Sequence, residues 1–259
     1  MKFELQITFH GDIAAFFLPP RLRAKSPIVR EMHEKASVKD VIEACGVPHP
    51  EVDLIVIDSA TGEGPFAADF RWQVEASSRI DLYGFPAPRE ILPWAPRLQT
   101  SRCERFVVDG HLGKLSRNLR LLGCDTFYEA RADDRRLLEI MSAENRAILT
   151  RDRRLLMHSV VQNGFCPRSS QPEKQTIEVL RRFGLYDSPG AIAPFTRCLE
   201  CNGLLMTVRK QDVSKQLAAE PRTLLYYDDY RLCAICGRIY WEGSHLAKLA
   251  ERVSRLLAQ

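Results

Sequence analysis

Two Cys-x-x-Cys pairs in the last third of the chain have the spacing of a metal site. They consist of Cys198, Cys201, Cys233 and Cys236. A tight turn places both thiolates of such a pair on one side, and Zn²⁺ accepts four thiolates tetrahedrally at about 2.3 Å. Asn202 and Gly237, which directly follow the pairs, both tolerate positive φ. We therefore expect one structural zinc ion, and the alternative is a pair of redox or disulfide motifs. A closed four-sulfur shell offers no open coordination position, so this zinc should stabilise the fold and perform no chemistry.

A set of aspartates stands where predicted strands end: Asp109, Asp133, Asp134 and Asp152. Asp109 follows the apolar run 106–108 and Asp152 follows 147–149, while the other two open a helix after the strand predicted at 126–128. In open parallel sheets, ligands bind at the carboxyl ends of the strands. Carboxylate oxygens suit Mg²⁺ or Mn²⁺, which can activate water and stabilise the leaving oxygen in phosphodiester hydrolysis. The alternative is that these side chains only end strands and cap helices.

Basic and aromatic side chains accompany the aspartates and the cysteines. The candidates for RNA contacts are Lys114, Arg117, Arg120, Arg151, Trp241 and His245. The cations could guide phosphates toward the acidic edge, Trp241 could stack on an unpaired base, and His245 could contact phosphate or transfer a proton. The alternatives are that the cations are ordinary solvated side chains and that the tryptophan packs under the zinc-binding turns.

The first 84 residues predict a small α+β module. Phe3, Leu5, Ile7 and Phe9 alternate with polar residues, as in a half-buried strand, and Ser37 is placed to cap a helix. The order of hairpin, helix and returning strands resembles the β-grasp, ubiquitin-like fold of small sulfur-carrier proteins. Those carriers end in Gly-Gly, whereas this chain continues past Gly84, so we interpret the module as an interaction or positioning unit. We expect it to offer a surface for a protein partner and to be dispensable for the metal chemistry.

The rest of the chain predicts three further segments. Residues 85–104 are rich in proline and form a linker. Residues 105–190 alternate strands and helices, which predicts a parallel sheet with covering helices. Residues 191–259 hold the cysteine pairs and end in a helix. The expected fold class is α/β, with a zinc ribbon and an N-terminal α+β domain.

Composition and charge narrow the function classes. Residues 1–96 carry 10 Lys and Arg against 14 Asp and Glu, whereas residues 97–259 carry 27 against 19. A basic region of this kind is compatible with binding to nucleic acid, and equally with a solvated basic surface. No apolar run approaches the roughly 20 residues that cross a bilayer, and the first residues lack the apolar block of a signal peptide. We expect no membrane association and a cytoplasmic location.

Several motifs together resemble the Mut-seven C-terminal RNase domain family, a PIN-like group of nucleases. They are FVVDGHLGKLSRNLRLLG (106–123), ADD (132–134), ILTRD (148–152), RCLECNG (197–203) and CAICGRIYWEGSH (233–245). The resemblance implies a PIN-like nuclease core with a zinc ribbon, preceded by a ubiquitin-like module. It implies a metal-dependent ribonuclease whose acids are Asp109, Asp134 and Asp152, with Asp133 as an extra ligand.

The leading hypothesis is therefore a ribonuclease that uses Mg²⁺ or Mn²⁺, with a ribbon that holds structural Zn²⁺ and aids RNA binding. The main alternative is a non-catalytic RNA-binding or ribosome-associated factor, and a third is an adaptor led by the ubiquitin-like module. The sequence does not distinguish tRNA, rRNA and mRNA as the partner.

Overall fold

The computed structural model describes residues 2–58, 64–100, 102–218 and 221–258, apart from the side chains of Pro221, Ser244 and His245. The chain forms two compact units. One contains residues 1–101 and 147–168, and the other contains residues 102–146 and 169–259. None of the helices in the described residues has the length and apolar character that crossing a membrane requires.

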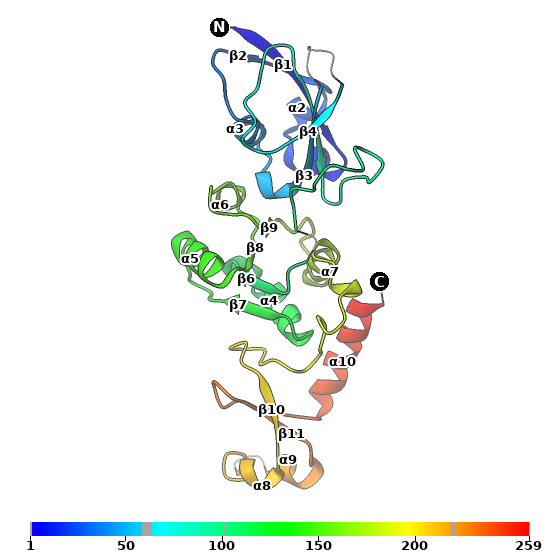
Figure 1. The fold of residues 1–259 in the computed structure, drawn as a ribbon. Coiled ribbons are helices and arrows are strands. Elements are labelled where there is room, and N and C mark those ends of the chain that lie inside the picture. The colour runs from blue at the N-terminus through cyan, green and yellow to red at the C-terminus, as the bar shows by residue number, and fades with distance from the viewer. Residues whose placement is uncertain (1, 59–63, 101, 219–220, 259) are drawn as a thin grey trace. The chain divides into compact units, whose positions relative to one another are not determined.

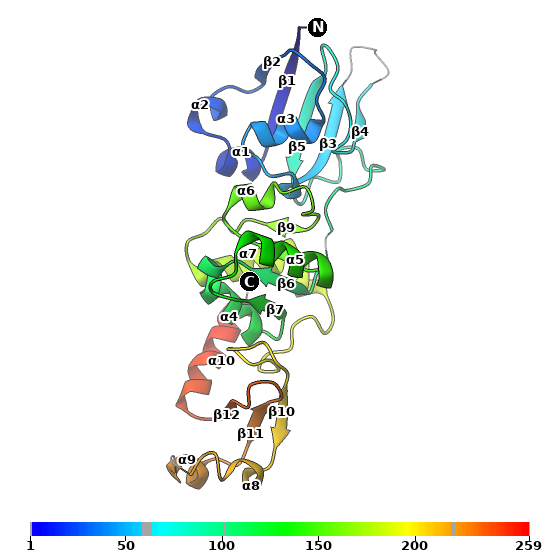
Figure 2. The same cartoon turned by 90° about the vertical axis from the view of Figure 1, so that its left-hand side faces the viewer.

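The N-terminal module is a mixed sheet with short helices. Its elements are β1 (Phe3–His10), α1 (Asp12–Phe17), α2 (Pro20–Arg23), β2 (Ile28–Met32), α3 (Val38–Ala44), η1 (His49–Glu51), β3 (Val52–Asp58), β4 (Phe66–Ala68) and β5 (Arg79–Gly84). The strands lie in the order β2-β1-β5-β3-β4, with β1 and β5 parallel and the other neighbours antiparallel. Figures 1 and 2 show α3 lying across one face of this sheet. The predicted β-grasp arrangement is confirmed.

Local sequence signals account for these elements. The alternating apolar residues of β1 are buried, while the residues between them are more exposed, so the strand has one face in the core. The Ser37 hydroxyl accepts a hydrogen bond from the backbone N–H of Asp40 at 3.2 Å and caps α3 as predicted. Residues 85–100 contain no helix or strand in their described part. They are tied down by the buried Asp53, whose carboxylate accepts N–H groups from Ala87 and Gln99 at 3.0 and 3.2 Å.

Residues 147–168 complete the first unit through a buried ion pair with the module. Glu51 is 3% exposed, and one of its carboxylate oxygens lies 2.7 Å from a terminal nitrogen of Arg168. Its other oxygen accepts the backbone N–H of Cys166 at 2.7 Å. The Arg168 guanidinium also lies 4.8 to 5.1 Å from the ring centres of Phe16, Phe17 and Phe165. An ion pair, a backbone hydrogen bond and cation–π contacts thus hold residues 147–168 against the module.

The second region alternates strands and helices as predicted. Its elements are β6 (Arg105–Val108), η2 (Gly110–Leu112), α4 (Gly113–Leu121), β7 (Asp125–Tyr128), α5 (Asp134–Glu144), β8 (Ala147–Leu149), α6 (Arg153–Leu156), β9 (Gly164–Phe165), α7 (Pro172–Arg182) and η3 (Leu185–Asp187). The strands form a parallel sheet in the order β7-β6-β8-β9. Helix α4 packs against β7 and α7, and α5 packs against β6. The buried leucines of α4 lie on one face of the helix. Gly123 follows the helix with a φ of 88°, a backbone conformation that ends helices.

The C-terminal part is an antiparallel ribbon followed by a helix. Its elements are β10 (Leu205–Val208), α8 (Lys210–Val213), α9 (Pro221–Tyr226), β11 (Tyr230–Cys233), β12 (Ile239–Trp241) and α10 (Ser244–Leu257). The strands lie in the order β10-β11-β12. Val213, Leu217 and Tyr230 form a small core of their own. The Tyr186 hydroxyl donates to the Leu256 carbonyl at 2.8 Å, so the end of α10 is fixed beside η3.

Candidate functional site

The four predicted cysteines come together in the ribbon. Their sulfur atoms all lie within 4.8 Å of one another. The Sγ–Sγ distance is 3.6 Å between Cys198 and Cys236 and 3.4 Å between Cys201 and Cys233. Four thiolates around a tetrahedral zinc would be about 3.8 Å apart, so the set fits this ion. All four cysteines are free of disulfides, and the gathering of both pairs around one point favours a shared zinc ion over two separate redox motifs.

The two zinc-binding turns have matching backbone geometry. Asn202 and Gly237 both have a φ of 70°, as their positions after the cysteine pairs predicted. Their N–H groups donate to the carbonyls of Cys198 and Cys233 at 3.0 and 3.1 Å. The Tyr240 hydroxyl lies 3.1 Å from the Cys198 sulfur. Burial alone would raise the pKa of the Cys198 thiol, but Tyr240 and nearby backbone amides stabilise the thiolate and lower its pKa to about 6. Zinc requires its cysteine ligands in this deprotonated form.

Arg120 links the first zinc-binding turn to strand β7 through hydrogen bonds. It is 3% exposed, and its guanidinium donates to the carbonyls of Thr126, Leu199 and Glu200 at 2.7 to 3.2 Å. Asn202 adds to this contact, because its side-chain oxygen accepts the Thr126 N–H at 2.9 Å. The sequence predicted an RNA contact for Arg120. Its donors serve the packing of the ribbon, so we do not include it in the RNA-binding surface proposed below.

A second buried arginine supports the start of β7. Arg146 is 6% exposed and lies 2.6 Å from the Asp125 carboxylate and 2.6 Å from the Glu144 carboxylate. Asn202 donates to Asp125 at 2.9 Å, and Arg197 pairs with it at 3.4 Å. Burial would raise the pKa of Asp125, but the hydrogen bonds from Arg146 and Asn202 outweigh it and lower that pKa. This network lies at the amino end of β7, so we interpret it as structural.

Asp109 directly follows β6, as predicted. Its side chain is 18% exposed, and one oxygen lies 3.1 Å from Nδ1 of His111, a residue to which the sequence interpretation gave no role. The signal for it was present, since Asp109-Gly-His111 is a single short motif. The loop packs tightly on the end of β7: the Tyr128 hydroxyl donates to the Gly110 carbonyl at 2.9 Å, and a Cβ at Gly113 would come within 2.6 Å of that hydroxyl. Glycine is therefore required for the close approach that fixes Asp109.

Asp133 and Asp134 lie at the start of α5, and both are exposed. Asp133 is the N-cap, and its carboxylate accepts the N–H of Arg136 at 2.8 Å. Asp134 is the first residue of the helix. Both positions agree with the predicted helix start, and the cap gives Asp133 a structural task of its own.

Asp152 follows β8 and begins α6. It is exposed, and one carboxylate oxygen accepts the N–H groups of Arg154 and Leu155 at 2.7 and 3.4 Å. The next residue, Arg153, donates to the carbonyls of Phe17 and Phe16 at 2.8 and 3.1 Å, and so fixes this turn to α1 of the N-terminal module. Asp152 is thus positioned by its own helix cap and by the module.

Within the described residues, the four cysteines are the one group of three or more potential metal ligands close enough to share an ion. Asp109, Asp133 and Asp134, which belong to one unit, form no second group of this kind there. The catalytic role of the aspartates stays a prediction.

The remaining RNA-contact candidates have different environments. Lys114 and Arg151 are exposed, while Arg117 is exposed and pairs with Glu200 at 2.9 Å. Trp241 is half-buried and packs against the small ribbon core. His245 lies in the first turn of α10, and its side chain lies outside the described part of the structure.

Comparison with known protein families gives two matches, which cover most of the chain. Residues 104–253 match the model of the Mut7-C RNAse domain, and residues 3–86 match that of the Mut7-C ubiquitin domain. No curated protein and no solved structure shows a significant match.

Proposed function

The chain belongs to the Mut7-C RNase domain family, which implies a nuclease, and from this premise we propose that it is a metal-dependent ribonuclease that hydrolyses RNA phosphodiester bonds. The observation that carries the proposal is the family match over residues 104–253. It is supported by the positions of Asp109 and Asp152, each directly after a strand of the parallel sheet, where ligands of such sheets bind.

We assign the catalytic ligands to Asp109, Asp134 and Asp152, with Asp133 as an extra ligand. When bound, Mg²⁺ or Mn²⁺ would activate water and stabilise the leaving oxygen. The protein's own part is to hold the carboxylates in place. His111 and the glycine-rich turn do this for Asp109, and the α6 cap with Arg153 does it for Asp152. Lys114, Arg117 and Arg151 are exposed cations that would contact the RNA backbone.

The test is cleavage of a labelled RNA with Mg²⁺, with Mn²⁺ and with a chelator. Asp109→Asn and Asp152→Asn should each reduce the rate by more than about 100-fold, because loss of mere outer-shell partners of a metal costs 10–100-fold. Asp58→Asn is the matched control, since Asp58 is also an exposed aspartate at a strand end, in β3. Cleavage that persists in both variants, or that needs no divalent ion, would rule out this mechanism.

A second function is favoured by one observation. Asp133 and Asp152 already serve as helix caps, which is a complete structural explanation for two of the four acids. The second function is that of an RNA-binding protein that does not cut RNA, in which the acids are structural. Tight RNA binding by the parent, with no cleavage under any divalent ion, would establish this alternative.

A further inference from the structure

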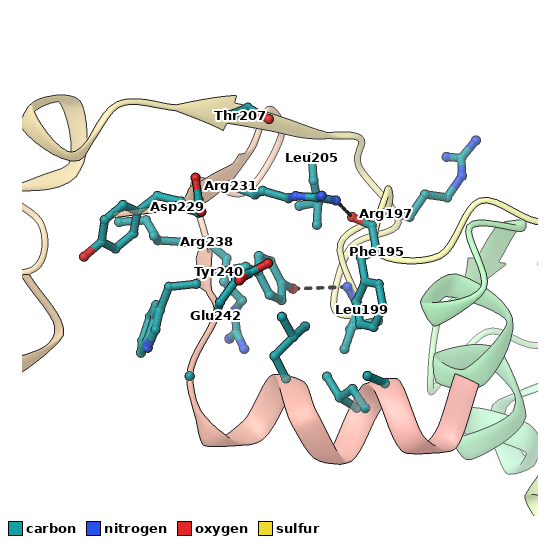
Figure 3. Close-up of a pocket in the computed structure, with 17 residues that line it drawn as sticks. Phe195, Arg197, Leu199, Leu205, Thr207, Asp229, Arg231, Arg238, Tyr240 and Glu242 are labelled. Atoms are coloured by element: carbon teal, nitrogen blue, oxygen red, sulfur yellow. Dashed lines mark hydrogen bonds between the residues drawn. The ribbon is translucent and has the colours of Figure 1, made fainter. Parts of the chain in front are cut away.

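A pocket of about 530 Å³ lies between the ribbon and α10 (Figure 3). Its volume is in the range of small-ligand sites. Aliphatic side chains provide much of its wall: Leu199, Leu205, Ile239, Leu246 and Leu249. The rings of Phe195 and Tyr240 and the arginines 231 and 238 also line it. Apolar walls with aromatic faces and nearby guanidinium groups suit a flat, polar ring that is attached to an anion.

Phe195 occupies an unusual backbone conformation. Its φ is 62°, a region that bulky residues rarely adopt. The conformation is held from two sides, because its N–H donates to the Leu121 carbonyl at 3.0 Å and its carbonyl accepts Nη1 of Arg231 at 2.6 Å. Backbone strain of this kind persists where neighbours enforce it, and it concentrates at ligand-binding sites. These bonds fix the backbone at this wall of the pocket.

Tyr240 supplies a second ring to the wall of the pocket. Its hydroxyl accepts the N–H of Leu199 at 3.1 Å, a bond drawn in Figure 3. The same hydroxyl contacts the Cys198 sulfur at 3.1 Å, so the zinc-binding turn fixes the ring orientation. Fixed aromatic faces of this kind are the platforms on which proteins stack unpaired bases.

Two arginines of the pocket wall, Arg231 and Arg238, can contact a phosphate. Arg117 and Arg238 share one carboxylate, that of Glu200, at 2.9 and 3.4 Å, so one positive charge is left over in this exposed trio. Arg231 bonds to a neutral carbonyl, which does not cancel its charge. Asp229 and Glu242 line the pocket as well, and carboxylates there can accept hydrogen bonds from the exocyclic amino group of a base.

The pocket and Asp109 belong to opposite ends of α4. Asp109 precedes the start of that helix, whereas the segment leading to Phe195 hydrogen-bonds to the carbonyls of Leu121 and Leu122 at its end. The helix has 9 residues and therefore a length of roughly 13 Å. A single nucleotide cannot reach both ends, so a ligand that does so must be an extended strand.

We propose that this pocket binds an unpaired base of the RNA substrate, several nucleotides from the cleaved bond, with Arg231 and Arg238 on the adjoining phosphates. The identity of the ligand rests on the proposed function. The pocket would favour RNA with an unpaired segment over fully paired RNA.

The test measures binding of two RNAs of about 20 nucleotides, an unpaired strand of alternating A and C and the same strand paired with its complement, to Asp109→Asn protein, which prevents cleavage. Ala250→Trp adds a bulky ring to the α10 side of the pocket and should weaken binding of the unpaired RNA roughly tenfold, the worth of one stacked base, with little effect on the duplex, whose bases cannot enter the pocket. Arg238→Gln should lower the slope of log Kd against log salt by about one phosphate contact. Lys248→Ala, on an exposed position of α10, is the matched control and should change neither value.

Unchanged binding of the unpaired RNA by zinc-loaded Ala250→Trp would overturn the pocket proposal, as would an equal loss for the duplex. If Ala250→Trp loses its zinc, Arg238→Gln decides, since it leaves the apolar wall intact: a salt slope equal to that of Lys248→Ala overturns the proposal. Failure of the proposed function gives a different result. Protein with Asp109 intact would then bind the unpaired RNA through the pocket and cut nothing, whereas binding of neither RNA would end both proposals.

Discussion

Replacing Arg168 with methionine should destabilise the first unit strongly. Methionine keeps much of the packing against the phenylalanine rings but removes the positive charge. Glu51, which is 3% exposed, would then keep a buried carboxylate with the Cys166 N–H as its remaining partner among these contacts. Removing one partner of a buried ion pair typically costs about 3–5 kcal/mol. Asp12, the other carboxylate on Arg168, is 57% exposed and can be hydrated again, so we assign nearly all of the cost to Glu51.

Hydrogen exchange in increasing urea measures this effect locally. Peptides from residues 147–168 report the free energy of opening of the first unit, and peptides from 102–146 serve as the internal reference. Adding Glu51→Gln to Arg168→Met should recover about 2 kcal/mol, because the neutral amide loses a hydrogen bond but buries no charge. Arg154→Met, at an exposed position of the same unit, should change the free energy by less than about 0.5 kcal/mol. A loss below about 1 kcal/mol for Arg168→Met, or no recovery in the double variant, would refute this reasoning.

Three further outcomes are expected. Elemental analysis should find one zinc per chain, and protein purified without chelator that lacks zinc would contradict the site. Cys198→Ser should unfold the ribbon, since structural zinc contributes roughly 10–16 kcal/mol in finger peptides. The lowered pKa of Asp125 means that its contribution to stability is fully present above its ordinary pKa of about 4 and is lost as pH falls through the folded value. Urea unfolding between pH 2 and 7 should show that the free energy of unfolding falls at low pH, and Asp125→Asn should make this fall smaller. The same pH dependence in Asp125→Asn would count against the Arg146 network. Gly123→Ala should lower the thermal midpoint, at a cost of more than about 1 kcal/mol, because a Cβ would collide with the Ala193 carbonyl at a φ of 88°.

Short-range patterns predicted much of the fold. The alternation in β1, the leucine face of α4 and the cysteine spacing each depend on a period or turn that a few neighbouring residues determine. The parallel direction of the strands followed from the alternation of strands with helices. The zinc ligands were predictable for the same reason, since each Cys-x-x-Cys pair needs only its own turn.

Tertiary partners could not be read from the sequence. Glu51 and Arg168 are 117 positions apart, and no local pattern links them. Arg120 falls among the polar residues of α4 in the sequence, yet it is buried because the ribbon packs over it. The expectation that the N-terminal module is dispensable for the metal chemistry stays a prediction, and it has to account for Arg153, next to Asp152, which bonds to backbone carbonyls of that module. A fragment that begins near residue 100 would lack these contacts.

The discontinuous first unit has a consequence for the order in which the protein acquires its structure. The ribosome makes Glu51 117 residues before Arg168, which at 5–20 residues per second is a delay of roughly 6–23 seconds. During this time the five strands of the module can pair, but the Glu51 carboxylate lacks its partner Arg168. The module therefore reaches its full stability only after most of the sheet region that follows it has been synthesised. A contact that stabilises the N-terminal module is thus supplied by a later part of the chain, and a ribosome stalled between these two residues would expose a module that lacks it.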